Sequence, residues 1–402
     1  MTTINKKKLY IVSEFVDEKT NSTGYFWFKI INGLSEKLED INVISLDQSC
    51  QKAVYQNNKV VYLPVKGSKS SVSGGFARKL LDNIVLSFKF SFKILRFVRS
   101  KAVVFSGTNP SMLVLFIAVL RPLIRFRWVL LVNDIFPENL APAQLLTSES
   151  FIFKITKYLF DFAYSRADRI IVIGRDMQKL VDKKTNNRSR TRYIPNWVDL
   201  DDISVASKNT YQPFSQMSFE DKVVFQFFGN MGAVQGLDIL LAAIAKTKNT
   251  KAKFVFIGSG LGIDLVNEFI KKNPFLDVEL HPPISFKDNN IGLNACDIAM
   301  VSLAPGMSGL AVPSKAYFSL AADKPIFVIG DLDAELDLLL KENEGIGWYC
   351  SSYSSGDIAK MLDNICDQDL TKYRNKPRSI IKDNYSYHSS IAQYLKVLNE
   401  LG

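Results

Sequence analysis

The chain has 402 residues, of which 47% are hydrophobic and 22% are charged, a composition that predicts a globular protein with a large core and excludes a disordered chain. Its 50 basic and 40 acidic residues give a formal charge of +10, which favours an anionic partner such as nucleic acid, a phospholipid surface or a phosphorylated substrate. The four cysteines are widely spaced and form no C-x-x-C pair, which argues against a zinc site and a disulfide framework and fits a reducing cytoplasm.

Strand-like and helix-like segments alternate through the first half of the chain. The N-terminus carries basic residues without a cleavable signal pattern. "KLYIVSEF" predicts a first buried strand and "GYFWFKIINGLSEKLE" the helix after it. "INVISL", "KAVVFSG", "RWVLLVNDI" and "DRIIVIG" predict further strands, with helices between them. Buried strands separated by helices predict a parallel sheet covered on both faces, so residues 1–202 are expected to form an N-terminal Rossmann-like domain.

Two segments of this half are basic and apolar together. Residues 110–132 are the longest apolar region, but they are interrupted by Arg121, Pro122, Arg125 and Arg127. The uninterrupted part is too short for the roughly 20 residues of a membrane span, so a core helix and a strand, or a helix on a membrane surface, are expected. Residues 79–99 have apolar residues at helical spacing among lysines and arginines. The basic and aromatic residues between positions 78 and 127 suit core packing, nucleic acid or anionic lipid alike.

A second alternation of strands and helices follows a polar stretch. Residues 203–222 have no clear period and are interpreted as a linker. Residues 223–384 predict a second doubly wound domain, and residues 385–402 a terminal helix. The predicted fold class is therefore α/β, with two Rossmann-like domains whose sheets can face a common cleft at the carboxyl ends of their strands.

Two glycine-rich turns follow successive strands of the second domain. "FFGNMGAVQGLDILL" places Gly229, Gly232 and Gly236 between a strand and a helix, and "FIGSGLG" places Gly258 and Gly260 after the next strand. Glycines let a backbone approach a ligand closely, and a helix N-terminus can bind an anion. The spacing is neither the dinucleotide fingerprint nor a Walker motif, and plain tight turns are the alternative.

"VPSKAYF" is a sharper signal for an anion site. Ser314 is expected to cap the following helix, and Lys315 lies in its first turn. A cation there is unfavourable for the helix dipole by a few tenths of a kcal/mol, and a bound pyrophosphate would reverse that preference. The alternative is a solvated surface lysine.

Two motifs of the first domain are candidates for an acceptor site. "VNDIFPENL" places Asp134 and Glu138 after a strand, where a carboxylate could bind an acceptor hydroxyl or take its proton. "NSTGYFWFK" places Thr23 and Gly24 at the entry to a helix. For both motifs the alternative is a helix cap or a surface turn.

Metal and triad chemistry find little support. Two D-x-D strings, Asp199-Leu-Asp201 and Asp331-Leu-Asp333, are expected by chance among 40 acidic residues, so no metal site is predicted. The only histidines are His281 and His388, and no Ser-His-Asp or Cys-His arrangement is evident.

These motifs, in their order and spacing, resemble a known enzyme family. "GNMGAVQGLDILLAAIA", "FIGSG", "VPSKAYFSLAADKPI" and "IGW" are similar to the donor-binding half of family 4 glycosyltransferases of the GT-B fold. "ADRIIVIGRDM" and "YIPNWVDL" resemble the end of that family's first domain. "VNDIFPENL" is similar to a segment in the branch that builds bacterial capsule, O-antigen and exopolysaccharide units.

The resemblance implies an activity, partners and a location. The second domain would bind a nucleotide-diphosphate sugar, with UDP favoured, and the first would bind a saccharide on polyprenyl pyrophosphate. Transfer of a hexosyl or N-acetylhexosaminyl group would retain configuration and need no metal or cofactor. The enzyme would lie in the bacterial cytoplasm, peripheral on the inner face of the cytoplasmic membrane and without nucleic acid, and its terminal helix would cross back to the first domain.

The resemblance and the motifs together give a set of expected site residues. The catalytic candidates are Asp134, Glu138 and Lys315, and the acceptor contacts are Thr23, Gly24 and Asp134. The expected donor contacts are Gly229, Asn230, Gly232, Gln235, Gly236, Gly258, Gly260, Ser308, Gly309, Pro313, Ser314, Lys315 and Tyr317.

The sequence also departs from the family pattern. Asn230 and Gln235 stand where many members have an arginine and a lysine, and Phe318 stands where a glutamate commonly holds the ribose. A diphosphate in a partly dry site needs compensating charge, so Lys315 with the helix N-terminus is expected to supply it. Two alternatives stay open: a non-catalytic GT-B partner of another transferase, and a GT-B sugar-nucleotide epimerase.

Overall fold

The computed structural model describes residues 8–19, 21–54, 59–67, 76–186, 190–214, 219, 221–285 and 288–401. The chain divides into two compact units, which are described separately. Unit 1 comprises Met1–Glu138, Thr147–Pro195 and His388–Gly402. Unit 2 comprises Asn139–Leu146 and Asn196–Tyr387.

Unit 1 is built on a seven-stranded sheet in the order β3-β2-β1-β4-β5-β6-β7. Every pairing between its described strands is parallel. The inner strands are apolar and mostly buried, as the sequence predicts for a sheet covered on both faces, whereas the edge strands β3 and β7 are more exposed. They are β1 (Leu9–Val12), β2 (Ile41–Leu46), β3 (Val61–Val65), β4 (Val103–Ser106), β5 (Arg127–Val132), β6 (Arg169–Val172) and β7 (Arg190–Tyr193).

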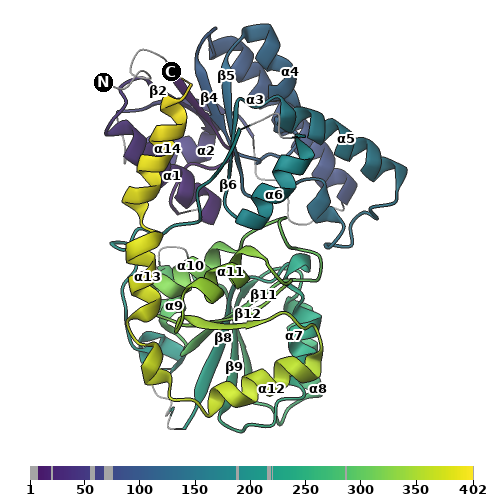
Figure 1. Cartoon of the computed structure of the whole chain (residues 1–402), viewed down its shortest axis with the longest axis vertical. Coiled ribbons are helices and arrows are strands. Elements are labelled where there is room, and N and C mark those ends of the chain that lie inside the picture. Colours follow the sequence, from purple (N-terminus) through teal and green to yellow (C-terminus); the bar gives the residue numbers. More distant parts are fainter. Residues whose placement is uncertain are drawn as a thin grey trace. The chain divides into compact units, whose positions relative to one another are not determined.

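The helices of unit 1 form two layers on its sheet. Trp27 and Tyr394, from the first and last helices, both pack their rings on Phe105 of β4, so these helices cover one face. Three others, α3, α4 and α5, pack side by side and lie on the other side of the sheet (Figure 1). The helices are α1 (Ser22–Ser35), α2 (Asp47–Val54), α3 (Phe76–Phe97), α4 (Leu113–Ile124), α5 (Phe151–Ser165), α6 (Arg175–Lys184) and α14 (Tyr387–Asn399).

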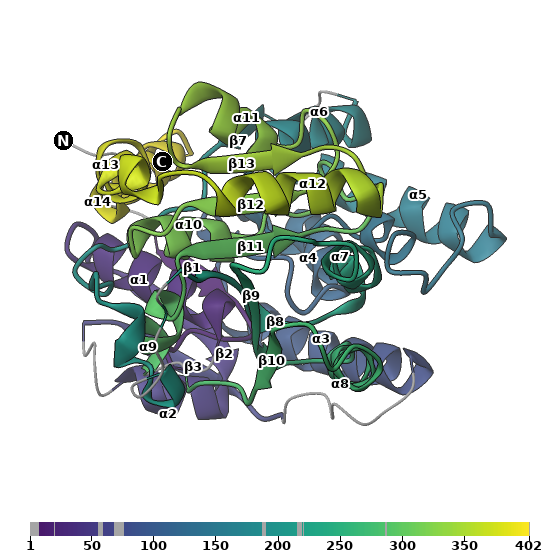
Figure 2. The ribbon, with the colours of Figure 1, turned by 90° about the horizontal axis from the view of Figure 1, so that it is seen from below.

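Unit 2 is built on a six-stranded sheet in the order β10-β9-β8-β11-β12-β13, again with every described pairing parallel. Figure 2 shows the strands in this sequence from β10 to β13. The strands are β8 (Val223–Asn230), β9 (Ala252–Ser259), β10 (Val278–His281), β11 (Ile298–Ser302), β12 (Ile326–Ile329) and β13 (Gly347–Cys350). The chain therefore contains two doubly wound α/β units, as predicted.

The helices of unit 2 also cover both faces of its sheet. Three of them, α7 (Leu237–Ile244), α8 (Ile263–Lys272) and α12 (Ser355–Cys366), contribute to one buried cluster with the strands, in which the Phe227 and Phe256 rings stack at 6.0 Å. On the other side α9 (Asn289–Asn294), α10 (Ser314–Ala321) and α13 (Lys376–Asn384) pack together (Figure 2). The remaining helix is α11 (Glu335–Glu342).

The expected linker and the longest apolar region each pack within a single unit. The described part of the expected linker, residues 203–222, packs on unit 2, because Ser204 and Ala206 donate backbone N–H groups to Asn290 and Asn294. The apolar region 110–132 forms α4, which buries one side and exposes the other, and the buried strand β5. Within the described ranges, no helix combines the length and apolar character needed to cross a bilayer.

Candidate functional site

The switch points of the two sheets are where ligands are expected. In each unit the strand order reverses between the first strand and the fourth along the chain, β1 and β4 in unit 1 and β8 and β11 in unit 2. Open α/β sheets leave a crevice there, outside the carboxyl ends of the strands. The glycine turn after β8 and the segment after β11 therefore lie where unit 2 is expected to bind a ligand.

The two glycine turns of unit 2 lie against each other. Gly229 and Gly258 have positive φ values of 107° and 155°, and a Cβ on Gly258 would lie 1.9 Å from the Gly229 carbonyl oxygen. A Cβ on Gly260 would lie 2.8 Å from Oδ1 of Asn230, whose side chain is exposed. An added Cβ has no space at Gly258 or Gly260, whereas Gly229 has open space and favours glycine through its positive φ. The turns are therefore a matched pair and not two separate bends.

The glycine turn after β8 also contacts the segment that follows β11. Gly236 has a φ of 56° and a Cβ there would lie 3.2 Å from Ala304, whose N–H donates to the carbonyl oxygen of Val234. Asp331, just beyond β12, holds the next residues by accepting hydrogen bonds from the N–H groups of Gly306 and Ser308. Expected donor contacts from three loops are thus brought together at one edge of the sheet.

The start of α10 differs from the expectation in its cap. Pro313 is the N-cap residue and Ser314 the first helical residue, and no side chain caps the helix. The prediction that Ser314 caps the helix is therefore wrong, because it lies one position too far into the helix. The first turn contains no acidic residue. The N–H of Ala316 donates to the carbonyl oxygen of Pro313, but the N–H groups of Ser314 and Lys315 have no acceptor in the described chain and remain available to an anion.

Lys315 is the cation of this site. Its side chain is half-buried, its Nζ lies 3.8 Å from the centre of the Phe227 ring, and its nearest polar partner is Oε1 of Gln235 at 3.4 Å. It forms no ion pair with a carboxylate of the described chain. Burial lowers the pKa of its ammonium group from 10.5 to about 7. A desolvated cation with only a neutral partner is stabilised when an anion binds.

Two residues that follow Lys315 point into the interior. Tyr317 is fully buried, and its ring packs edge-on against Tyr385 at 5.4 Å. Its predicted contact with a donor is wrong for the side chain, which does not reach the surface. Phe318 is 5% exposed, so the position of the family's ribose-binding glutamate is occupied by a core residue.

Asp134 lies after β5 in unit 1 and is half-buried. Its carboxylate forms no hydrogen bond or ion pair with the part of the chain that is described. Burial raises the pKa of its carboxyl group from 3.8 to about 6. A carboxylate without a partner and with a pKa near neutrality has the properties of a group that accepts a proton in catalysis.

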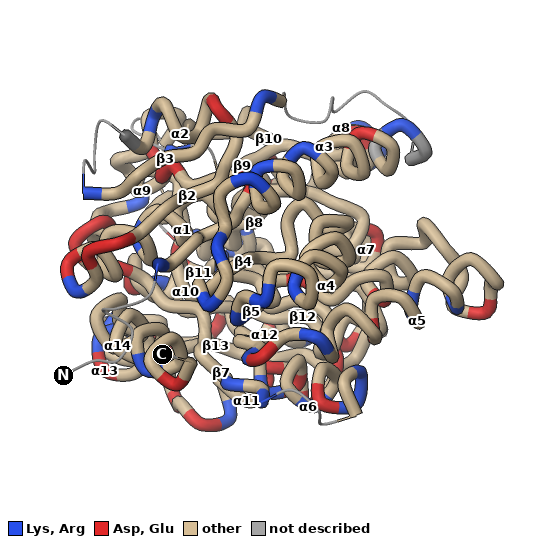
Figure 3. Tube along the Cα trace, turned by 90° about the horizontal axis from the view of Figure 1, so that it is seen from above, with Lys and Arg blue, Asp and Glu red and all other residues tan. Residues whose placement is uncertain are grey.

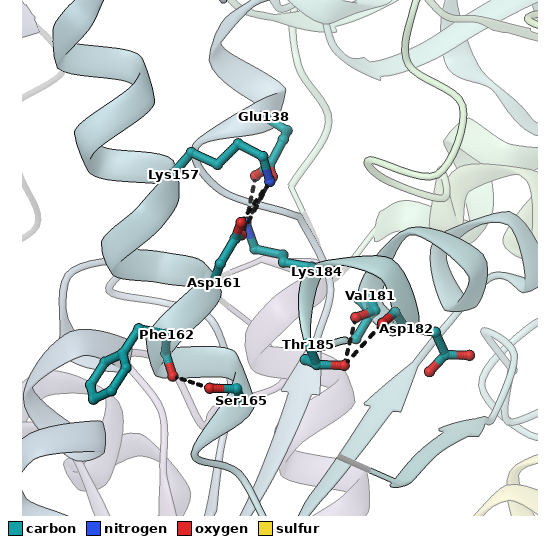
Figure 4. Close-up of polar contacts among 9 residues, drawn as sticks. All are labelled: Glu138, Lys157, Asp161, Phe162, Ser165, Val181, Asp182, Lys184 and Thr185. Carbon is teal, nitrogen blue, oxygen red and sulfur yellow. Dashed lines mark hydrogen bonds and ion pairs between the residues drawn. The ribbon is translucent and has the colours of Figure 1, made fainter. Parts of the chain in front are cut away.

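Glu138 is engaged in an ion network instead. It begins a short 3-10 turn, Glu138–Leu140, and together with Asp161 it binds the ammonium groups of Lys157 and Lys184 at 2.5–2.9 Å (Figure 4). Burial raises the pKa of Glu138, but the two lysines, Lys184 foremost, outweigh this effect and lower it. A carboxylate with two cationic partners stays ionised and is held in place. The candidate catalytic role of Glu138 is therefore not supported by the geometry.

Thr23 and Gly24 lie in the first turn of α1. Asn21 is the N-cap residue, and its Oδ1 accepts the N–H of Gly24 at 2.8 Å. A Cβ on Gly24 would lie 2.4 Å from the carbonyl oxygen of Asp17, so glycine is needed for packing. Thr23 remains half-exposed beside this turn.

Sequence reasoning missed two kinds of residue in these regions. Asp331 was considered only as part of a D-x-D string, although its position directly after β12 is a signal that it could organise a loop. The sequence contains no signal for the lysines of the Glu138 network. Lys157 lies within α5, and Lys184 follows Lys183 at the end of α6, where nothing in the sequence shows which of the two is buried. No group of three or more His, Cys, Asp or Glu side chains in the described ranges could hold a metal ion.

Comparison with known proteins identifies the family. The chain is 37% identical over 408 residues to the probable glycosyltransferase WbjE of Pseudomonas aeruginosa, and the alignment covers 98% of both proteins. The chain belongs to the glycosyltransferases of the GT-B fold. No protein-family model matches the chain. A second relative of this glycosyltransferase is the putative colanic acid biosynthesis glycosyl transferase WcaI of Escherichia coli K12, 22% identical over 44% of each chain.

Solved structures support the same fold. Sucrose-phosphate synthase from Thermosynechococcus elongatus superposes on the glycosyltransferase with a TM-score of 0.78 at 11% identity, covering 98% of this chain and 99% of its own. Anabaena Alr3699/HepE, solved with UDP and glucose, superposes with a TM-score of 0.70 at 14% identity, covering 98% and 100%. At these identities the likeness concerns the fold alone.

Proposed function

We propose that this glycosyltransferase moves a sugar from a UDP-type nucleotide sugar to a saccharide carried on polyprenyl pyrophosphate, in the synthesis of a bacterial surface polysaccharide. The observation that carries the donor half is Lys315, a half-buried cation beside an uncapped helix N-terminus, with no carboxylate partner in the described ranges. HepE, which shares the fold, binds UDP and glucose, and WcaI is named for colanic acid synthesis. Both support the proposal.

The proposed donor site uses the backbone more than side chains. The N–H groups at the start of α10 and in the turn Gly229–Gly236 would face the diphosphate, and Lys315 would give the one charged contact. Asn230 and Gln235 would add neutral hydrogen bonds. Leaving-group charge is the main electrostatic problem of glycosyl transfer, and a cation already held in place stabilises that charge without reorganisation.

The proposed acceptor site is in unit 1. Asp134 would accept the proton of the attacking hydroxyl, because its carboxylate has no competing partner in the described chain and its pKa is near 6. The resemblance to family 4 leads us to propose retention of anomeric configuration without a metal ion, so the hydroxyl would attack from the face that the diphosphate leaves and its proton would pass to Asp134. Proton NMR of the product and transfer in the presence of a chelator test these two points.

Nucleotide binding tests the donor half of the proposal. UDP, GDP and their sugar conjugates are titrated calorimetrically into the wild type, into Lys315→Ala and into Lys360→Ala. Lys360 is an exposed lysine on α12 and serves as a control for loss of one charge. Loss of a charge-assisted contact is expected to weaken binding by roughly 1.5–3 kcal/mol in Lys315→Ala alone. If no nucleotide binds the wild type, a non-catalytic partner of another transferase becomes the better reading.

We also propose that unit 1 binds the membrane surface through α3, α4 and α5. A groove of about 560 Å³ lies between α3 and α4, lined by apolar side chains that include Phe88, Phe92 and Val119. One side of α5 exposes Phe151, Ile152, Ile155, Tyr158, Leu159 and Phe162. Lys89 and Arg96 on α3 are exposed among these groups. An apolar face bordered by cations fits anionic lipid.

Vesicle binding tests this surface. At low salt the wild type is expected to sediment with vesicles of phosphatidylcholine and phosphatidylglycerol in equal parts, and not with phosphatidylcholine alone. Phe88→Ser with Phe92→Ser removes two exposed rings and is expected to reduce binding. Phe275→Ser, at a site 80% exposed in unit 2, is the matched control. Equal binding by all three proteins would contradict the assignment of this face.

A further inference from the structure

An arginine-lined pocket lies at the amino-terminal ends of the unit 1 strands, about one strand length, roughly 20 Å, from Asp134 at the carboxyl end of β5. Its volume is about 560 Å³. Figure 3 shows Lys and Arg positions gathered around β4, β5 and α4. The cationic residues that line the pocket are Arg121, Arg127, Arg166, Arg169 and Arg190.

The acidic residues of the pocket neutralise only part of this charge. Asp168 accepts hydrogen bonds from Arg121 and Arg127 at 2.7–3.0 Å, and from the backbone N–H of Trp128. Glu400 pairs with Arg169 at 2.8 Å, and it also pairs with Arg192, which is outside the pocket lining.

Two guanidinium groups are left over in the pocket. Arg166 and Arg190 are exposed and have no carboxylate partner in the described part of the chain. Two carboxylates therefore face five guanidinium groups, which leaves an excess of positive charge available to a ligand.

Ordinary structural reasons explain only some of these arginines. Arg121 in the last turn of α4 and Arg166 at the C-cap of α5 are favoured by the helix dipole. Arg127, Arg169 and Arg190 are the first residues of three neighbouring parallel strands. Arg127 and Arg169 have Asp168 and Glu400 as carboxylate partners, whereas Arg190 has no carboxylate partner in the described chain. Arg169 and Arg190 are direct register partners, and like charges opposite each other in a sheet are unfavourable. A bound anion would offset this repulsion.

The side chains around the pocket indicate the class of anion. Arginine forks match the geometry of phosphate oxygens, and an amphiphile would also need an apolar neighbour. Leu123, two residues after Arg121, is 70% exposed. Phe162 is 46% exposed, and the Arg166 guanidinium lies 4.8 Å from the centre of its ring. The pocket thus borders the apolar side of α4 and α5.

We propose that this pocket binds a phosphate group, and that the phosphate is the headgroup of an anionic phospholipid whose chains meet α4 and α5. The evidence for a phosphate site is the set of arginines that line the pocket. The assignment to a lipid rests on the proposed membrane association of the same helices. Binding here would hold unit 1 at the membrane by a specific headgroup contact in addition to its general positive charge.

The test uses the full chain and two soluble compounds, short-chain dihexanoylphosphatidic acid below its micelle concentration and inorganic phosphate. Each is titrated into the wild type, with the donor site saturated by UDP and again without UDP. The test variant is Arg166→Gln with Arg190→Gln, which keeps the Asp168 and Glu400 ion pairs. The control is Lys360→Gln with Lys382→Gln, which removes two exposed charges from unit 2.

The wild type and the control are expected to bind the phosphatidic acid. The affinity of the test variant for it is expected to be lower by a factor of about ten or more, while its affinity for UDP stays the same. Equal affinity for inorganic phosphate and phosphatidic acid would support the phosphate site and overturn the lipid assignment. No binding by the wild type, or equal binding by the test variant, would overturn the proposal. If the wild type binds phosphatidic acid but no nucleotide, the proposal for this pocket is supported and the proposed donor site is refuted.

Discussion

Raising the pH above neutrality is expected to weaken nucleotide binding, because Lys315 loses its charge there. Burial against Phe227 lowers the pKa of its ammonium group to about 7, so the free protein carries the cation below that pH and the neutral amine above it. A diphosphate stabilises the charged form, which raises the pKa again in the complex. Binding above pH 7 therefore takes up a proton, and the apparent affinity falls as protons become scarce.

The size of the effect follows from the two protonation states. Between the pKa of the free protein and that of the complex, each pH unit costs about 1.36 kcal/mol, or tenfold in affinity. From about pH 7 to about pH 9 the dissociation constant of UDP should rise roughly 100-fold. The terminal phosphate, with a pKa of about 6, stays ionised over this range and does not contribute.

Calorimetry in buffers with different ionisation enthalpies measures both the affinity and the proton uptake. Lys315→Ala should bind weakly at every pH, since it has no group to titrate. Lys315→Arg should remove the pH dependence while keeping a charge, because the guanidinium does not deprotonate in this range. The same affinity in the wild type at both ends of the range would refute the reasoning that the Lys315 ammonium group holds the diphosphate.

Three further substitutions test the other groups. Asp134→Asn should lower the rate of transfer about 10²–10⁴-fold and leave the affinity for UDP unchanged. The wild-type rate should fall about tenfold for each pH unit below the Asp134 pKa of about 6. Product formation measures both rates. Lys184→Met leaves two carboxylates without their buried partner and should lower the free energy of unfolding in urea by about 3–5 kcal/mol. Lys154→Met, which breaks an exposed pair, should cost less than about 1 kcal/mol, and equal losses would contradict this account. Gly258→Ala should cost about 1–3 kcal/mol and abolish UDP binding, whereas Gly356→Ala, where the nearest atom to an added Cβ is 3.8 Å away, should do neither.

Most of the architecture could be predicted from the sequence, because buried parallel strands appear as continuous apolar runs. Runs such as "RWVLLV" and "AKFVFIGS" are apolar on both faces, and each became a buried strand of a parallel sheet. Residues 110–132 form a helix and a strand, one of the two structures that the sequence predicts, since three arginines and a proline leave no room for a membrane span. The domain boundary near residues 203–222 was harder to predict, because a polar composition does not show whether a segment packs against a domain. Hydrogen bonds to Asn290 and Asn294 hold its described part on unit 2.

Only part of the candidate site could be predicted from the sequence. Glycines such as Gly258 are detectable because a close backbone approach excludes every other residue, and that requirement is visible in the sequence as a G-x-G turn. The direction of a side chain is not visible in this way. Tyr317 and Lys315 are two residues apart on α10, yet the tyrosine is fully buried while the lysine reaches the surface.

The sequence by itself determined the fold class, the two glycine turns and the presence of one lysine at the start of a helix, because each depends on residues close together in the chain. The tertiary structure decided which charged groups have partners. Glu138 and Asp134 come from one motif, but helices α5 and α6 bring Lys157 and Lys184 to the first, while the second has no ion-pair partner in the described chain. The difference arises because a charge's pKa and availability depend on what packs against it in three dimensions.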